Sequence, residues 1–148
     1  MQIELPESTR LWQQQVRDYV DRELIPHEVA AELNGGELPA EVMQQIQEKA
    51  ITLGLPGMDA PASHGGLGLG MVDQVAAWEV LGRATNALCW CFPEAQSWMY
   101  EACADSQYQL ETYVRPLLEG TRREAYAITE AESGSHEVIN STAKLTDR

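Results

Sequence analysis

Cysteine is scarce in this chain, and the few cysteines present do not suit a disulfide framework or a zinc site. There are three in 148 residues, Cys89, Cys91 and Cys103. An odd number without a secretory leader argues against a set of disulfides. The Cys89-x-Cys91 spacing is wrong for a zinc knuckle, and no second Cys/His pair lies nearby. We therefore expect reduced thiols that pack in the interior, and no metal site.

Basic residues and long apolar runs are also lacking. Lys and Arg total 10 against 23 Asp and Glu, for a formal net charge of -13. Such a surface repels phosphate backbones and anionic lipid, so nucleic acid and membrane surfaces are poor partners. No apolar stretch approaches the ~20 residues of a membrane span, and the N-terminus has no basic region followed by an apolar one. We expect a cytoplasmic protein that does not bind membranes.

The residues that are present predict a mainly helical fold. Hydrophobic residues make up 44% and charged residues 22% of the chain, which is typical of a globular protein. Its length suits one domain, or one domain and a short addition. Apolar residues recur at three- and four-residue steps. They predict an N-terminal bundle of about five to six helices, the clearest over 6–24, 39–53, 71–84, 86–103 and 106–118.

Proline and glycine mark the ends of these helices. We expect Pro26 to bend or end the first helix and Pro93 to kink the fourth. Gly54 is placed for a left-handed cap, and the glycine-rich stretch 55–70 is expected to be a loop with little regular structure. Residues 71–84 are apolar on nearly every face, which predicts a helix buried on most sides at the centre of the bundle.

The pattern changes after Gly120. Residues 124–129 and 141–146 alternate weakly between apolar and polar, which favours two β-strands. We therefore divide the chain into a helical domain over 1–122 and a short β segment over 123–148, the start of a β-domain.

One motif in that segment is the most informative part of the chain. Residues 126–136 read Tyr-Ala-Ile-Thr-Glu-Ala-Glu-Ser-Gly-Ser-His. They resemble the flavin-contacting segment of the acyl-CoA dehydrogenases, which usually reads aromatic-x-apolar-T-E-P-x-A-G-S-D. Three further stretches resemble that family in the same order: Leu24-Ile25-Pro26, the glycine-rich run from Leu53 to Gly68, and the run from Tyr113 to Gly120.

The resemblance implies a three-part subunit: a helical N-terminal domain, a β-barrel-like middle domain and a C-terminal four-helix bundle. It implies FAD as cofactor, an acyl-CoA thioester as substrate, an electron-accepting flavoprotein or other acceptor as partner, and a homo-oligomer. The reaction would be α,β-dehydrogenation with hydride transfer to the flavin. The sequence looks like the front third of such an enzyme, and we expect it to be inactive alone.

The matching positions carry the family's site residues. The resemblance gives flavin-contacting roles to Tyr126, Ile128, Thr129 and Ser135, with Ser135 also a candidate for the CoA ester. Glu130 matches the motif's acid, which we interpret as structural. The catalytic carboxylate would come from later segments, so this chain contains no catalytic residue. Three positions in the loop depart from the motif: Ala131 for Pro, Ser133 for Ala, and His136 for Asp.

Other candidates have plainer explanations. His64 precedes two glycines but has no nucleophile in a recognisable arrangement, so a turn histidine is favoured. The glycine-rich run follows a helix rather than a strand, which argues against phosphate binding. Cys89, Phe92, Gln96 and Met99 would share one helical face, either as core or as an acyl-pocket wall. A free-standing helical module that binds a partner or an acyl chain, without redox activity, is the alternative for the whole chain.

Overall fold

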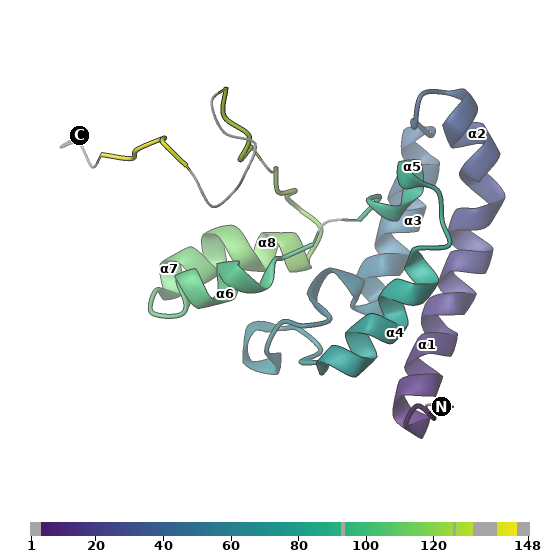
Figure 1. Cartoon of the computed structure of the whole chain (residues 1–148), viewed down its shortest axis with the longest axis horizontal. Coiled ribbons are helices and arrows are strands. Elements are labelled where there is room, and N and C mark those ends of the chain that lie inside the picture. Colours follow the sequence, from purple (N-terminus) through teal and green to yellow (C-terminus); the bar gives the residue numbers. More distant parts are fainter. Residues whose placement is uncertain (1–3, 93, 126, 132–138, 145–148) are drawn as a thin grey trace.

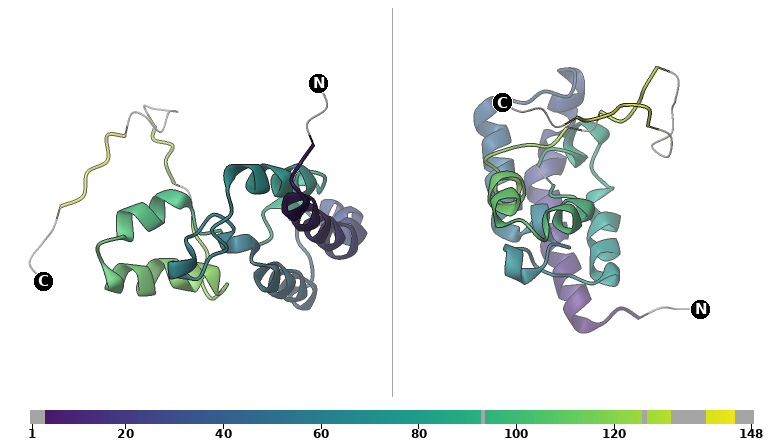
Figure 2. Two further views of the ribbon diagram at one scale, coloured as in Figure 1. Left: turned by 90° about the horizontal axis from the view of Figure 1, so that it is seen from below. Right: turned by 90° about the vertical axis from the view of Figure 1, so that its left-hand side faces the viewer.

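The structure is a computed structural model that describes residues 4–92, 94–125, 127–131 and 139–144. It is mainly helical, as predicted. The long helices α1, α3 and α4 lie side by side, and a second group formed by α6, α7 and α8 stands apart from them, with the 55–70 loop between (Figures 1 and 2). The two groups enclose separate clusters of buried apolar side chains.

The first helix is longer than predicted. It comprises α1 (Glu7–Tyr19), a π-helical turn η1 (Val20–Leu24), a 3-10 turn η2 (Ile25–His27) and α2 (Glu28–Leu33), which follow one another without a gap (Figure 1). Pro26 lies inside the 3-10 turn and does not end the helix. The sequence prediction placed the helix over 6–24 and expected Pro26 to bend or end it, because a proline inside a helix lacks an N–H group and clashes with the preceding turn.

A second proline is accommodated in the same way. Pro116 belongs to α8 (Arg115–Leu118) and follows the π-helical turn η5 (Leu110–Val114). A proline ring clashes with the carbonyl four residues earlier. In both helices that carbonyl, of Arg22 or of Thr112, lies in the wider π-helical turn. The carbonyl oxygen of Thr112 then accepts a hydrogen bond from the Arg122 guanidinium at 3.2 Å.

Helix α3 (Ala40–Leu53) confirms the clearest sequence prediction. Gly54 follows it with a φ of +85°, the left-handed conformation that glycine adopts at little cost. Its N–H group donates to the carbonyl of Ile51 at 2.9 Å. Ile46 and Ala50 are buried on the inner face of this helix. They join the larger buried cluster, together with side chains from α1 and α4.

Helix α4 (Met71–Leu81) is less buried than predicted. Ala76, Ala77, Val80 and Leu81 are in the core, and the helix packs mainly against α1. Met71, Val72 and Val75, however, are 71%, 56% and 59% exposed. The prediction of a helix buried on most sides was therefore wrong. Apolar side chains are often exposed on protein surfaces, so an apolar sequence does not by itself predict burial. In this fold one face of α4 packs against other helices.

The predicted helix over 86–103 is two helices. Helix α5 (Asn86–Cys89) and α6 (Ser97–Cys103) are separated, and residues 90–92 and 94–96 are not helical. Pro93 lies outside the described residues, but a proline at that position disfavours helix both at itself and just before it. The proposed common face of Cys89, Phe92, Gln96 and Met99 was therefore wrong. Phe92 belongs to the larger cluster, whereas Met99 packs against the smaller one.

The predicted helix over 106–118 is confirmed. Helix α7 (Gln107–Gln109), η5 and α8 form it without a gap, and the Ser106 hydroxyl accepts from the N–H of Gln109 at its start. Gly120, at a φ of +71°, follows the end. Its N–H group donates to the carbonyl of Leu117.

The 55–70 loop is more ordered than predicted. It contains the 3-10 turns η3 (Leu55–Gly57) and η4 (Ala62–His64), and its start is buried. The two arms of the loop are joined by hydrogen bonds, from the N–H of Leu67 to Gly57 at 2.9 Å and from the N–H of Leu69 to Met58 at 2.7 Å. A Cβ atom on Gly66 would lie 2.2 Å from the carbonyl oxygen of Ala60. Close packing, rather than phosphate binding, therefore explains this glycine.

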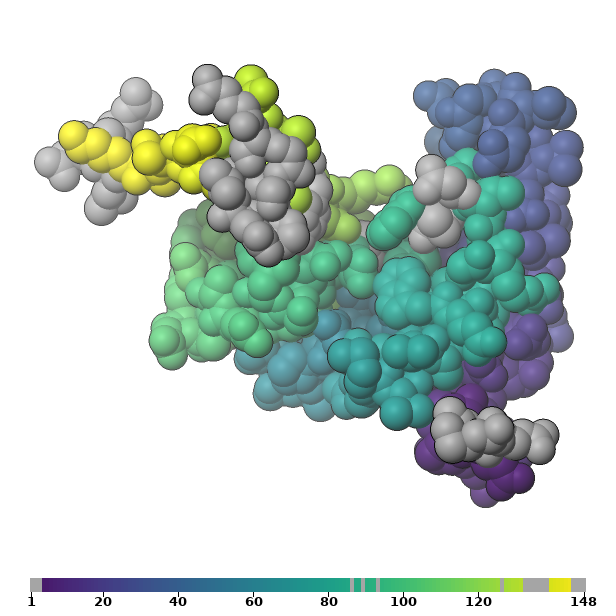
Figure 3. Space-filling view, viewed as in Figure 1, coloured from purple at the N-terminus to yellow at the C-terminus, as the bar shows by residue number. Residues whose placement is uncertain are grey.

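The predicted β segment is not confirmed. Among the described residues from 121 to 144, none belongs to a strand, and Glu130 is the one residue of this described set that takes part in an isolated β-bridge. Figure 3 shows the yellow part of this segment standing off from the helical body. Two strands without a larger sheet are marginal in water, which is the physical reason that weak alternation did not produce them here.

Candidate functional site

The C-terminal segment begins against the helical domain. After Gly120, Arg122 donates to the carbonyl of Thr112. The carboxylate of Glu124 accepts from the backbone N–H of Glu94, with N–O distances of 3.3 and 3.4 Å. The residues between α5 and α6 therefore hold the start of the segment that contains the predicted flavin contacts.

The structure describes two of the four predicted site residues. Ile128 is 38% exposed and Thr129 is also exposed. Tyr126 and Ser135 lie outside the described residues. Exposed Ile128 and Thr129 leave an apolar side chain and a hydroxyl donor accessible to a ligand or to another part of a protein.

Glu130, next to Thr129, has well-defined partners. Its two carboxylate oxygens accept hydrogen bonds from the backbone N–H groups of Asn140 at 2.7 Å and Ser141 at 2.8 Å. Hydrogen bonds from Ser141 and Asn140 to the ionised carboxylate hold the pKa of Glu130 below its ordinary value. These contacts agree with the interpretation of Glu130 as a structural acid.

A cavity of about 430 Å³ adjoins the start of this segment, and it is lined by Trp90, Glu94, Gln96 and Glu124. Three of these four residues are polar, and the fourth, Trp90, is 66% exposed. The volume lies within the usual range of small-molecule sites. The cavity is therefore large enough for part of a ligand.

Glu94 is the electrostatically unusual group of this cavity. Burial raises its pKa, and the negative charges of Asp59 and Glu124 raise it further, whereas a hydrogen bond from Gln96 acts in the opposite direction. The Gln96 amide donates to the Glu94 carboxylate at 2.9 Å. Burial also raises the pKa of Asp59. The described residues that line the site thus include two acids, Glu94 and Glu124, and neither Lys nor Arg.

Sequence reasoning did not identify Glu94 or Glu124. They are 30 residues apart, and no spacing rule relates an acid after a helix break to one beyond the last helix. The only local signal was Pro93, which indicated that residues 94–96 leave the helical path.

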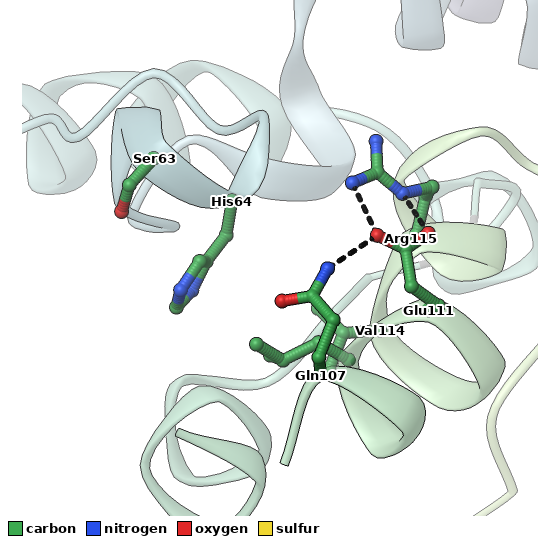
Figure 4. Close-up of a pocket in the computed structure, with 7 residues that line it drawn as sticks. Ser63, His64, Gln107, Glu111, Val114 and Arg115 are labelled. Carbon is green, nitrogen blue, oxygen red and sulfur yellow. Dashed lines mark hydrogen bonds and ion pairs between the residues drawn. The ribbon is translucent and has the colours of Figure 1, made fainter. Parts of the chain in front are cut away.

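A second pocket lies between the 55–70 loop and the last helices (Figure 4). Ser63 and His64 are on one side, and Gln107, Glu111 and Arg115 are on the other. Gln107 and Arg115 both donate to the Glu111 carboxylate, at 2.7 and 2.8 Å. The pocket volume is only about 40 Å³, which is room for water rather than for a nucleotide or an acyl chain.

His64 lies at the edge of this pocket as the last residue of the 3-10 turn η4. Its Nδ1 atom is buried and has no hydrogen-bond partner among the described residues. No Ser, Cys or Thr hydroxyl or thiol is hydrogen-bonded to it there, so a nucleophile–base pair is not formed. The structure supports the interpretation of a turn histidine.

Within the described residues, no cluster of three or more His, Cys, Asp and Glu side chains is arranged to hold a metal ion. Within the same residues, no helix combines the length and apolarity that crossing a membrane requires. The side chains of Cys91 and Cys103 are buried.

The family described as "Acyl-CoA dehydrogenase, N-terminal domain" matches residues 6–121. The chain is 27% identical over 139 residues to "Probable acyl-CoA dehydrogenase YngJ" of Bacillus subtilis, covering 91% of this chain and 35% of that protein. It is 28% identical over 137 residues to the mitochondrial "Short-chain specific acyl-CoA dehydrogenase" of Mus musculus, covering 90% and 32%.

A third relative is named as part of a larger complex. It is the "Caffeyl-CoA reductase-Etf complex subunit CarC" of Acetobacterium woodii, 25% identical over 131 residues, covering 87% of this chain and 34% of that protein. No solved structure matched significantly. The chain spans about a third of the length of the curated relatives it matches. Because the family match covers most of the chain, this protein belongs to the acyl-CoA dehydrogenase N-terminal domain family.

Proposed function

We propose that this chain is the N-terminal part of an FAD-dependent acyl-CoA dehydrogenase-like oxidoreductase. The observation that carries the proposal is the order of two features. The family match ends at residue 121, and the flavin-type motif containing Thr129 and Glu130 follows within ten residues. The proposed reaction is α,β-dehydrogenation of an acyl-CoA thioester.

The described residues fit one edge of a flavin. Thr129 offers a hydroxyl, Ile128 an apolar side chain, and both are exposed rather than used in the core. Tyr126 and Ser135 complete the proposed set by their places in the motif, and Ser135 is also proposed to contact the substrate. When bound, FAD supplies the hydride acceptor. These residues would bind and orient the flavin ring. Holding the ring close to the substrate would lower the activation barrier of the reaction.

The proposal assigns no catalytic base to this chain. Glu130 is the acid nearest to the flavin-type residues, but its oxygens are occupied by the N–H groups of Asn140 and Ser141. A carboxylate stabilised in its ionised form is a weaker proton acceptor. The base is therefore proposed to lie outside residues 1–148, and we expect the 148-residue chain alone to be inactive.

The proposed partners follow from the family and from one relative. An electron-accepting flavoprotein is proposed because a matched relative is named as a subunit of a complex with Etf. A homo-oligomer and a cytoplasmic location stay predictions from the resemblance and the composition. Nucleic acid and membranes are not proposed as partners, because a net charge of -13 repels both phosphate backbones and anionic lipid.

One observation favours the alternative of a helical binding module without redox activity. The exposed apolar side chains Met71, Val72 and Val75, together with Leu5, border a cavity of about 230 Å³. An apolar surface of this kind can bind a partner protein. A stop codon directly after codon 148 would support the binding module. Codons for a β-domain and a helical bundle would support the oxidoreductase.

The experiment compares the 148-residue chain with a chain extended through the following codons. We expect the short chain to purify colourless and the extended chain to carry FAD and reduce an artificial electron acceptor in the presence of an acyl-CoA. The adenosine and pyrophosphate contacts lie outside the short chain in this proposal. Their loss should weaken FAD binding roughly a thousandfold or more. Stoichiometric FAD on the short chain, or an inactive extended chain saturated with FAD, would refute the proposal.

A further inference from the structure

Glu130 joins two points of the C-terminal segment that are ten residues apart in sequence. One carboxylate oxygen accepts from the N–H of Asn140 and the other from the N–H of Ser141. We refer to these three residues as the Glu130 clamp. Both N–H groups point toward the same carboxylate, although successive N–H groups of a regular strand point in opposite directions. This arrangement at Ser141, the first residue of the predicted strand over 141–146, differs from that of a regular strand.

The clamp is a strong contact for an exposed segment. Hydrogen bonds from backbone N–H groups to an ionised carboxylate are roughly twice as strong as those between neutral groups. Two convergent N–H groups resemble the backbone arrangement that binds anions elsewhere in proteins. Here the anion is a side chain of the same segment, so the contact restricts the backbone at residue 130 and at residues 140–141 together.

We propose that Glu130 is a positioning residue, whose clamp on Asn140 and Ser141 fixes the backbone orientation of the adjacent Thr129. The assignment of Thr129 as a flavin contact rests on the proposed function. The physical step is short: residues 129 and 130 share a peptide unit, so fixing the Glu130 side chain on one side limits the directions open to Thr129 on the other. Glu130 would act through Thr129 and would not contact the substrate itself.

The experiment is a pH titration of the isotopically labelled 148-residue chain followed by NMR. We expect the amide protons of Asn140 and Ser141 to move upfield together as pH falls, because protonation of Glu130 removes the anionic acceptor. The midpoint should lie below the ordinary glutamate value, since the pKa of Glu130 is lowered by these hydrogen bonds. The backbone signals of Thr129 should shift with the same midpoint.

Two variants make the test specific. Glu130→Gln should abolish the shared titration at Asn140, Ser141 and Thr129. Glu101→Gln, which changes an exposed acid of α6, should leave it intact. A circular dichroism spectrum checks that the helical domain is unaffected, since Glu130 lies outside both buried clusters.

Each negative result has a distinct meaning. If Asn140 and Ser141 do not titrate, the clamp is absent in solution and the proposal fails. If they titrate and Thr129 does not, the clamp exists without a positioning role, and the proposal also fails. An extended chain that lacks FAD or activity would overturn the proposed function while leaving this titration unchanged, so the two failures are distinguishable.

Discussion

The backbone N–H of Glu94 donates to the carboxylate of Glu124, at 3.3 and 3.4 Å from its two oxygens. This contact connects the break between α5 and α6 with the segment that leaves α8. It also brings the carboxylate of Glu124 close enough to raise the pKa of Glu94, to which burial contributes most. The start of the flavin-type segment is therefore held at a place where the helical domain gathers negative charge.

The first prediction concerns this pair of acids. Because the pKa of Glu94 is raised in the folded chain, the folded state holds that proton more tightly than the unfolded state. The contribution of Glu94 to stability is therefore full at acidic pH and is lost as pH rises through its raised pKa. Glu94→Gln should increase the free energy of unfolding at pH 7, as measured by urea unfolding. The variant should also show a smaller decrease of this free energy between acidic and neutral pH than the wild-type chain. The exposed change Glu101→Gln should do neither, and an unchanged pH profile for Glu94→Gln would contradict the prediction.

The second prediction concerns the close packing of the 55–70 loop. Gly66→Ala places a Cβ atom 2.2 Å from the carbonyl oxygen of Ala60, so backbone must move. We expect a loss of about 1–3 kcal/mol in the free energy of unfolding. Gly70→Ala is the matched control, since Gly70 has an ordinary φ of -69° and its nearest neighbour would be 3.9 Å away. Thermal unfolding should separate the two variants, and equal melting temperatures would show that the loop is not tightly packed.

The third prediction concerns the exposed apolar face of α4. Met71, Val72 and Val75 should promote self-association of the 148-residue chain at high concentration. Val75→Lys should reduce this association and change stability by no more than about 0.5 kcal/mol, because the side chain is 59% exposed. Val29→Lys places the same charge on an exposed position of α2 and should have a smaller effect. Sedimentation velocity measures both, and a wild-type chain that stays monomeric would count against the prediction.

The fourth prediction concerns Thr129 in the extended chain. Thr129→Val removes the hydroxyl and keeps the shape, so the cost should be that of one hydrogen bond, about 0.5–1.5 kcal/mol. FAD affinity should fall roughly two- to twelvefold, as measured by flavin fluorescence during dialysis. Thr142→Val makes the same change at another exposed position of the segment and should leave FAD affinity unchanged. Equal FAD retention in the two variants would remove Thr129 from the proposed site.

Some features could be predicted because they depend on residues close in sequence. Helix α3 and its cap need only the apolar repeat and Gly54, whose left-handed conformation is set within one turn. The same holds for the helix from Gln107 to Leu118 and for Gly120 after it. The family was also readable from the sequence, because its motifs occur in the expected order.

Other features depended on contacts between distant segments. The sequence shows that α4 is apolar on nearly every face, but its packing against α1 decides that Val80 is buried and Val75 exposed. Pro26 marks a disturbance in the first helix, whereas the π-helical turn that lets the helix continue is a property of the folded backbone.

The candidate site also has features that depend on neighbouring residues and features that depend on distant ones. The family and the motif around Thr129 could be recognised from the order of the amino acids, because a motif is a pattern of neighbouring residues. The contacts of Glu124 with Glu94, and of Glu130 with Asn140 and Ser141, depend instead on how the folded chain brings these residues together. The physical reason is that a hydrogen bond needs two groups within about 3 Å in the right orientation, and the path of the whole intervening chain sets that distance.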